Sequence, residues 1–260
     1  MSMHIEIVGS GPYLALLHGW GMHGGVWDGV RDALAQRFRL HIVDLPGYGE
    51  IGDRPQFHES RNWGLSPISR AVAAALPEKV YVCGWSLGGQ VALEMARLFP
   101  GQVERLVLTA STPCFTVREG WPWAVPREVL LEFAVDLETD YEGALKRFLT
   151  LQARGGDEVK TVLKRLRDIL FARGRPDVQT LRAGLNILLE SDLRGHAATI
   201  QTPTLLLHGD RDMLTPVGAA HWLAEQMPKS RLEVLPGAAH APFLSHPVEF
   251  TEMMTGFLND

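Results

Sequence analysis

A six-residue turn, Gly84-Trp85-Ser86-Leu87-Gly88-Gly89, constrains the fold of this chain more than any other segment. It directly follows the apolar run Val80–Cys83, which has the pattern of a buried strand, and precedes a helical pattern that begins at Gln90. Glycines let a strand and a helix approach closely around a serine with a strained backbone. Such a strand–turn–helix presents the serine hydroxyl as a nucleophile, with a helix N-terminus beneath it. A tight turn that merely contains a serine is the alternative.

Short apolar runs along the chain predict a mostly parallel, doubly wound α/β sheet. Continuous runs of this kind are typical of strands that are covered on both faces. Helical patterns at Val26–Gln36 and Gln90–Phe99 alternate with them, which favours the same architecture. The predicted strands are Tyr13–Leu17, Leu40–Val43, Val80–Cys83, Leu106–Thr109, Thr204–Leu207 and Arg231–Leu235.

The alternation of strands and helices stops between about residues 113 and 200. This stretch has the pattern of four amphipathic helices, near 126–138, 141–153, 157–172 and 177–190. We therefore expect an α/β core formed by residues 1–112 and 201–260, with a helical lid or cap, 113–200, inserted into it. Segments inserted over the carboxyl ends of strands usually cover a ligand crevice.

A serine nucleophile needs a general base, and His240 is the candidate. It lies in a loop of small residues just after the last predicted strand. A loop histidine alone is more often structural, but the nucleophilic turn upstream favours a catalytic role. Two residues compete for the acid that orients it. Asp210 directly follows a strand and is able to cap the turn, whereas Asp212 opens a loop to the next helix, and we favour Asp212.

Negative charge on an attacked carbonyl requires two N–H donors. The backbone of Leu87, next to the nucleophile, is one. The loop His18–Gly21, which follows an early strand, offers the N–H of Trp20 as the second. The Trp20 indole is also placed to wall an acyl pocket. The alternative is a glycine turn with a packing aromatic.

Composition excludes several classes of protein. The chain has 260 residues and a net charge of −5, which argues against a general nucleic-acid binder. No apolar run is long enough for a membrane span, and the N-terminus lacks the features of a secretory signal, so we expect a cytoplasmic protein. Its two cysteines rule out a disulfide scaffold. No metal-ligand spacing or phosphate-binding glycine loop is present, so we predict no metal and no cofactor. Without a coiled coil or a repeat, a monomer is expected.

A basic segment, residues 143–175, stands out from this acidic chain. It holds nine Lys and Arg against three acidic residues. A solvated helix face and a docking site for an anionic partner are about equally supported. The candidate partners are an acidic carrier protein, a coenzyme A thioester and a membrane surface. A membrane is disfavoured, because the apolar faces of these helices are needed to pack on the core.

At these residues the sequence resembles the α/β-hydrolase superfamily over essentially its whole length. Several motifs narrow the resemblance to the pimeloyl-acyl-carrier-protein methyl ester esterases of biotin synthesis. The motifs are His18–Gly21, Asp44–Gly47, Gly84–Gly89, Pro113–Phe115, Phe148–Gln152 and Ala239–Phe243.

The resemblance implies an activity and a set of site residues. It implies a serine carboxylesterase that converts pimeloyl-acyl carrier protein methyl ester to pimeloyl-acyl carrier protein and methanol through an acyl-enzyme. Ser86, Asp212 and His240 form the implied triad, and the acidic carrier is the implied partner, met by Arg147, Lys160 and Lys164. The implied substrate-binding residues are Trp20, Ser86, Leu87, Phe148, Leu149, Thr150, Leu151, Gln152 and His240.

Two other functions fit the same residues. One is a broad carboxylesterase or lipase that acts on short acyl esters, because the fold does not set the substrate. The other is a non-catalytic binding module with a hydrolase fold. An intact Ser86, Asp212 and His240 disfavours the module.

Overall fold

A seven-stranded sheet forms the centre of the molecule in the computed structural model, which describes residues 3–48, 63–172 and 177–260. The strand order is β1-β3-β2-β4-β5-β6-β7, and only β1 runs antiparallel to its neighbour. The strands are β1 (Ile5–Val8), β2 (Tyr13–Leu17), β3 (Arg39–Val43), β4 (Val80–Trp85), β5 (Val103–Thr109), β6 (Thr204–Gly209) and β7 (Ser230–Leu235). This confirms the predicted fold class and all six predicted strands.

Strand β1 was not predicted from the sequence. The strand is only four residues long and lies at the edge of the sheet, where it pairs with β3 alone. Because its residues are half-buried or exposed, it lacks the continuous apolar run that marked the other strands.

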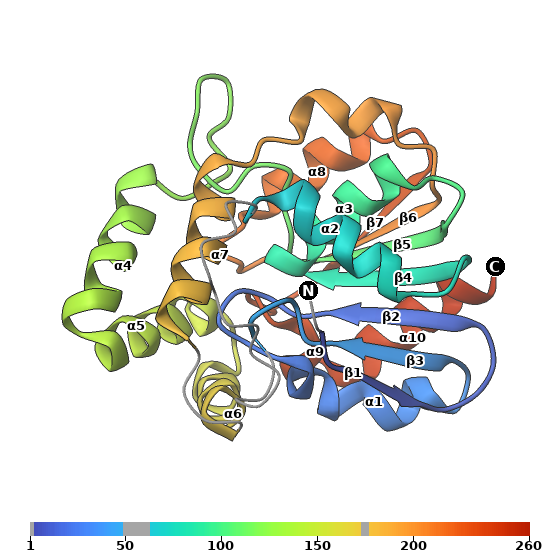
Figure 1. The fold of residues 1–260 in the computed structure, drawn as a ribbon, viewed down its shortest axis with the longest axis horizontal. Coiled ribbons are helices and arrows are strands. Elements are labelled where there is room, and N and C mark those ends of the chain that lie inside the picture. The colour runs from blue at the N-terminus through green and yellow to red at the C-terminus, as the bar shows by residue number, and fades with distance from the viewer. Residues whose placement is uncertain (1–2, 49–62, 173–176) are drawn as a thin grey trace.

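Helices cover both faces of the sheet (Figure 1). On one face lie α2 (Leu65–Ala75), α3 (Leu87–Leu98) and α8 (Val217–Gln226). On the other lie α1 (Asp28–Ala35), α9 (Pro242–Ser245) and α10 (Pro247–Asn259). Among the described residues, no helix combines the length and the apolar character that crossing a membrane requires.

Two predicted helix starts were wrong. The helix expected from Gln90 begins three residues earlier, at Leu87, because tertiary packing accepts the two glycines that made its first turn look non-helical. The helix expected from Val26 begins as a short 3-10 turn, Gly24–Trp27, and becomes α-helical only at Asp28.

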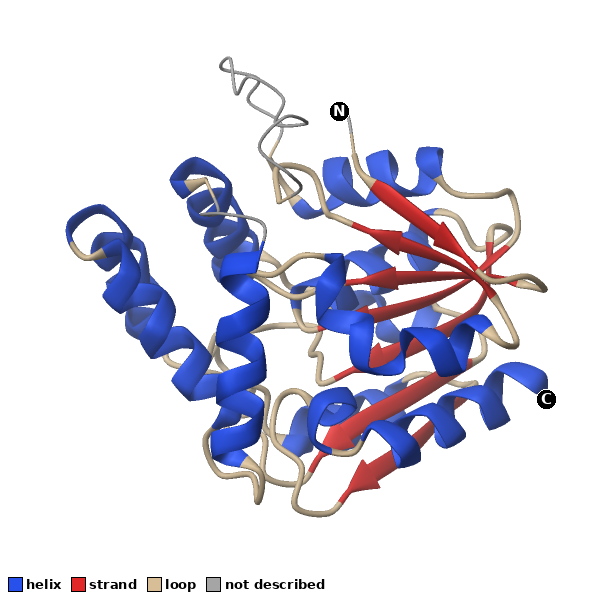
Figure 2. Cartoon of the chain, turned by 90° about the horizontal axis from the view of Figure 1, so that it is seen from below, coloured by secondary structure: helices blue, strands red, loops and turns tan. Residues whose placement is uncertain are grey.

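In the described part of the chain between β5 and β6, four α-helices lie where the sequence predicted them, and a 3-10 helix, Arg194–Thr199, follows them. The four α-helices are α4 (Arg127–Thr139), α5 (Tyr141–Ala153), α6 (Val159–Ala172) and α7 (Val178–Glu190). We call these four helices the cap. Figure 2 shows the cap beyond the carboxyl ends of the parallel strands, where ligands bind in sheets of this type. It buries apolar faces such as Val162, Leu166 and Leu170 of α6.

Glycines bring β4, α3 and β2 into contact around residue 86. A Cβ atom on Gly84 would lie 2.2 Å from the carbonyl oxygen of Gly88, and one on Gly88 would lie 2.4 Å from that of Leu17. A Cβ on Gly89 would lie 2.3 Å from Ser111 Oγ. These distances are far shorter than van der Waals contact, so the backbones approach this closely only without side chains.

We expect Gly88→Ala to lower the free energy of unfolding by about 2–4 kcal/mol, because the added methyl group meets backbone that has no room to move. Urea unfolding measures the change. The matched control is Gly256→Ala on α10, where a Cβ meets nothing within 4 Å. There we expect a gain of about 0.5–1 kcal/mol from better helix propensity. Equal effects of the two substitutions would contradict the packing argument.

Candidate active site

Ser86 occupies a strained position between β4 and α3. Its φ is 56°, in the left-handed region that side chains rarely adopt. Hydrogen bonds hold it there: its N–H donates to the Thr109 carbonyl at 3.1 Å, and its carbonyl accepts from Ser111 Oγ at 2.9 Å. The strained turn projects the Ser86 hydroxyl beyond the carboxyl end of the sheet.

The structure brings His240 and Asp212 to Ser86. His240 Nε2 lies 2.9 Å from Ser86 Oγ, and His240 Nδ1 lies 2.8 Å from Asp212 Oδ2. Because a carboxylate only accepts, the ring proton is on Nδ1, and Nε2 is free to take the proton of the serine. The three side chains follow β4, β6 and β7, whose carboxyl ends share one edge of the sheet.

The backbone of His240 is anchored on both sides. Its carbonyl accepts a hydrogen bond from the Trp85 indole at 2.7 Å, and its N–H donates to the Gln152 carbonyl of α5 at 3.2 Å. The core and the cap therefore both position the base. Sequence reasoning missed this use of Trp85, because nothing local relates it to a loop 155 residues away.

Asp212 is buried and ionised. Its Oδ1 accepts the N–H groups of Leu214 and Thr215, each at 2.9 Å, and its Oδ2 accepts the Thr215 hydroxyl at 2.6 Å as well as the His240 ring. Burial acts to raise the pKa of Asp212, but His240 and the other donors lower it below its usual range.

Asp210, the competing candidate for the acid, lies elsewhere. It is exposed, and its carboxylate accepts the N–H of Gly237 at 2.7 Å. It ties the loop after β6 to the loop that leads to His240. This is the turn-capping role that the sequence analysis weighed for it.

The segments expected to supply the two oxyanion donors lie next to Ser86. Leu87 begins α3, so its N–H has no partner inside the helix. The Trp20 loop lies against the serine, since a Cβ on Gly19 would lie 3.2 Å from Ser86 Cβ. The Trp20 indole donates to the Leu181 carbonyl of α7 at 2.8 Å and packs edge-on against Phe148, with ring centroids 4.5 Å apart.

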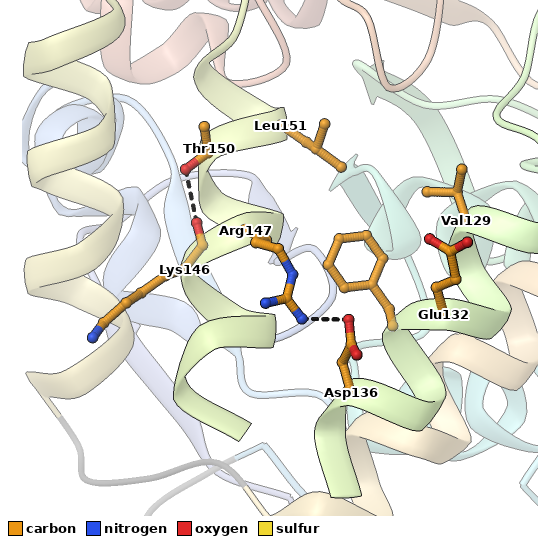
Figure 3. Close-up of a pocket in the computed structure, with 8 residues that line it drawn as sticks. Val129, Glu132, Asp136, Lys146, Arg147, Thr150 and Leu151 are labelled. Atoms are coloured by element: carbon orange, nitrogen blue, oxygen red, sulfur yellow. Dashed lines mark hydrogen bonds and ion pairs between the residues drawn. The ribbon is translucent and has the colours of Figure 1, made fainter. Parts of the chain in front are cut away.

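The segment Phe148–Gln152 divides between two sides of α5. Phe148, Leu149 and Gln152 are buried, whereas Thr150 is exposed. Thr150 and Leu151 line a groove of about 410 Å³ between α4 and α5 that includes none of the triad (Figure 3). That the whole run lines the substrate site stays a prediction, and for these two residues it requires the substrate to reach the groove between α4 and α5. Successive helix residues point about 100° apart, so five in a row cannot share one side.

The predicted docking cations also differ in their surroundings. Lys160 and Lys164 are exposed on α6, and Lys164 lies 3.2 Å from Asp168. Arg147 instead forms an ion pair with Asp136 of α4 (Figure 3) and a second one with Asp140. Two members of the basic segment, Arg173 and Arg175, lie outside the described residues.

The geometry of Ser86, His240 and Asp212 suits acyl transfer to water. A base within hydrogen-bond reach of a hydroxyl, itself oriented by a carboxylate, is the arrangement that activates a serine. Within residues 3–48, 63–172 and 177–260, no group of three or more His, Cys, Asp or Glu side chains is placed to hold a metal ion.

We expect a serine-reactive phosphonate to label Ser86, and His240→Ala to slow that labelling at least about a thousandfold, because the serine loses its base. Mass spectrometry of the labelled peptide measures the rate. His196→Ala, at an exposed histidine, is the control and should label at the wild-type rate. Similar rates for the two variants would show that His240 does not activate Ser86.

Comparisons with known proteins agree with this architecture. The sequence profile of the α/β hydrolase family matches residues 14–253. A pimeloyl-[acyl-carrier protein] methyl ester esterase from Nitrosomonas europaea is 47% identical over 249 residues, which are 96% of each chain. One from Aeromonas hydrophila is 42% identical over 99% of this chain and 100% of its own. An esterase from Exiguobacterium antarcticum superimposes with a TM-score of 0.86 at 25% identity, covering 99% of this chain and 96% of its own. This chain therefore belongs to the α/β hydrolase family, as its motifs predicted.

Proposed function

We propose that this protein is a serine carboxylesterase that hydrolyses the methyl ester of pimeloyl-acyl carrier protein. The observation that carries the esterase activity is the continuous hydrogen-bonded chain from Ser86 through His240 to Asp212. The substrate is supported by the two relatives of that name, which are 47% and 42% identical to this chain over nearly its full length.

The first half of the reaction forms an acyl-enzyme. His240 Nε2 takes the proton of Ser86 as Oγ attacks the ester carbonyl, and Asp212 stabilises the imidazolium. The N–H groups of Leu87 and Trp20 hold the oxyanion, and each such donor is worth about 10²–10³ in rate. His240 then gives its proton to the methoxy oxygen as the bond to carbon breaks, so methanol leaves instead of methoxide.

The second half returns the enzyme to its starting state. Water takes the place of methanol beside His240, loses its proton to Nε2 and attacks the acyl carbon. As the bond to Oγ breaks, His240 returns that proton to Ser86. When the carboxylic acid product departs, Ser86, His240 and Asp212 are back in their starting protonation states.

The cap supplies the surroundings of the acyl chain. Phe148 and Leu149 of α5 place apolar side chains close to the loop of His240, because the Gln152 carbonyl of α5 accepts the His240 N–H. Trp20, from the loop after β2, packs against Phe148. The Gln152 amide is buried, and its oxygen and nitrogen have no hydrogen-bond partner within the described part of the chain. A buried amide of this kind is suited to contact a polar group of the substrate.

We place the docking of the acidic carrier on α6. The exposed Lys160 and Lys164 project opposite the buried apolar face of that helix. Arg147 contributes less, because two carboxylates already balance its charge. Because these ion pairs take Arg147 out of the three predicted docking cations, they favour the second candidate function, a broad short-chain carboxylesterase. A monomeric state and a cytoplasmic location stay predictions.

A paired kinetic assay distinguishes these functions. We expect kcat/KM for pimeloyl-acyl carrier protein methyl ester to exceed that for a short p-nitrophenyl ester and to fall as salt rises, because screening weakens the attraction between carrier and cap. Comparable rates that are insensitive to salt would identify a broad carboxylesterase.

Charge reversal locates the docking surface. We expect Lys160→Glu with Lys164→Glu to lower kcat/KM for the carrier-linked ester by about tenfold or more and to leave the short ester unaffected. The matched control is Lys79→Glu on the core, because the Lys79 and Lys164 side chains are each 73% exposed. Equal losses with Lys79→Glu would mean that net charge, and not α6, attracts the carrier.

A further inference from the structure

Two buried side chains beside the triad, Thr215 and His208, have no part in the mechanism above. His208 belongs to β6, and Thr215 lies in the loop between β6 and α8, three residues after Asp212. Both residues are buried from solvent, since Thr215 is 0% and His208 is 1% exposed. Polar groups buried this deeply need partners, so their contacts define what they do.

The Thr215 hydroxyl lies at the junction of three polar side chains. Its Oγ1 is 2.6 Å from Asp212 Oδ2, and 3.4 Å from both His240 Nδ1 and His208 Nε2. A hydroxyl has one proton to donate, and the short contact to an ionised acceptor takes it. Thr215 therefore donates to the same carboxylate oxygen that accepts the ring proton of His240.

His208 holds Thr215 in place from the other side. Its Nε2 is 2.5 Å from the Thr215 carbonyl oxygen, which only accepts, so Nε2 carries the proton. Burial lowers the pKa of His208 more than the facing Asp212 carboxylate raises it, which keeps the ring neutral near pH 7. The bond closes the loop from residue 208 to residue 215 around Asp212.

We propose that Thr215, held by His208, is a positioning residue for the triad. Its hydroxyl fixes the direction of Asp212 Oδ2 and draws negative charge away from it, so the carboxylate orients His240 without binding its ring proton too strongly. The proposal rests on the serine-esterase mechanism above and does not depend on the carrier-linked substrate.

Thr215→Val tests the proposal, because it removes the hydroxyl and keeps the shape of the side chain. On a short p-nitrophenyl ester we expect kcat to fall about tenfold or more with little change in KM. We also expect the acid limb of the kcat/KM profile to move to higher pH by about half a unit to one unit, since a carboxylate with one donor fewer attracts the imidazolium more strongly. Among the described residues, the titratable groups that act on one another here are Asp212, His208 and His240, and His221 of α8 also acts on His208.

Two further variants separate positioning from packing. Thr215→Ser keeps the donor, and we expect its kcat to lie within about threefold of wild type with the acid limb in place. Thr204→Val removes a buried hydroxyl at the other end of β6, where it donates to the Thr202 carbonyl. We expect that change to lower Tm and to leave the pH profile unmoved. Should Thr215→Val not fold, Thr215→Ala removes the same hydroxyl and provides the same comparison.

The outcomes separate this inference from the proposed substrate. Thr215→Val and Thr215→Ser with equal kcat, or an acid limb that stays in place or moves to lower pH, would overturn the positioning role. A wild-type enzyme that is active on the short ester but indifferent to the carrier-linked ester would overturn the proposed substrate and leave the Thr215 comparison intact.

Discussion

The left-handed backbone of Ser86 is the constraint on which the rest of the structure depends. A φ of 56° is costly for a residue with a side chain, so the surrounding structure must enforce it. It does so with the close approach of β4, α3 and β2, which only glycines at 84 and 88 allow. The same approach aims the first N–H groups of α3 at the space where the attacked carbonyl develops charge. The close approach of β4, α3 and β2 thus serves both the fold and the reactivity of Ser86.

The base is held by distant segments of the chain, and its acid is held by donors of its own loop. His240 is fixed between the Trp85 indole of the core and the Gln152 carbonyl of the cap, and Asp212 is surrounded by donors from its own loop. Burying a carboxylate costs free energy unless it is well hydrogen-bonded, and the donors around Asp212 provide those hydrogen bonds. Because the cap contributes to the placement of His240, its helices are part of the catalytic structure as well as a cover.

Charge in the cap is used in two different ways. Arg147 of α5 pairs with Asp136 of α4, and Arg182 of α7 pairs with Glu138 of α4, so acidic α4 is bound to its neighbours. The cations of α6 lie on an exposed face instead. Exposed charges add little to stability but act at a distance on a charged partner, which makes α6 the surface to test for carrier docking.

The sequence by itself determined six of the seven strands, the four cap helices and the candidate nucleophilic serine, because these depend on local patterns. The apolar composition of runs such as Thr204–Leu207 predicts that they are buried, and the glycines around Ser86 predict a strained turn. Only the tertiary structure decided which neighbours those residues meet. It separated Thr150 from Phe148, balanced the charge of Arg147, and placed Thr215 and His208 around Asp212. Such contacts depend on how strands and helices pack in space. The distance between two residues in the fold cannot be read from their separation along the chain.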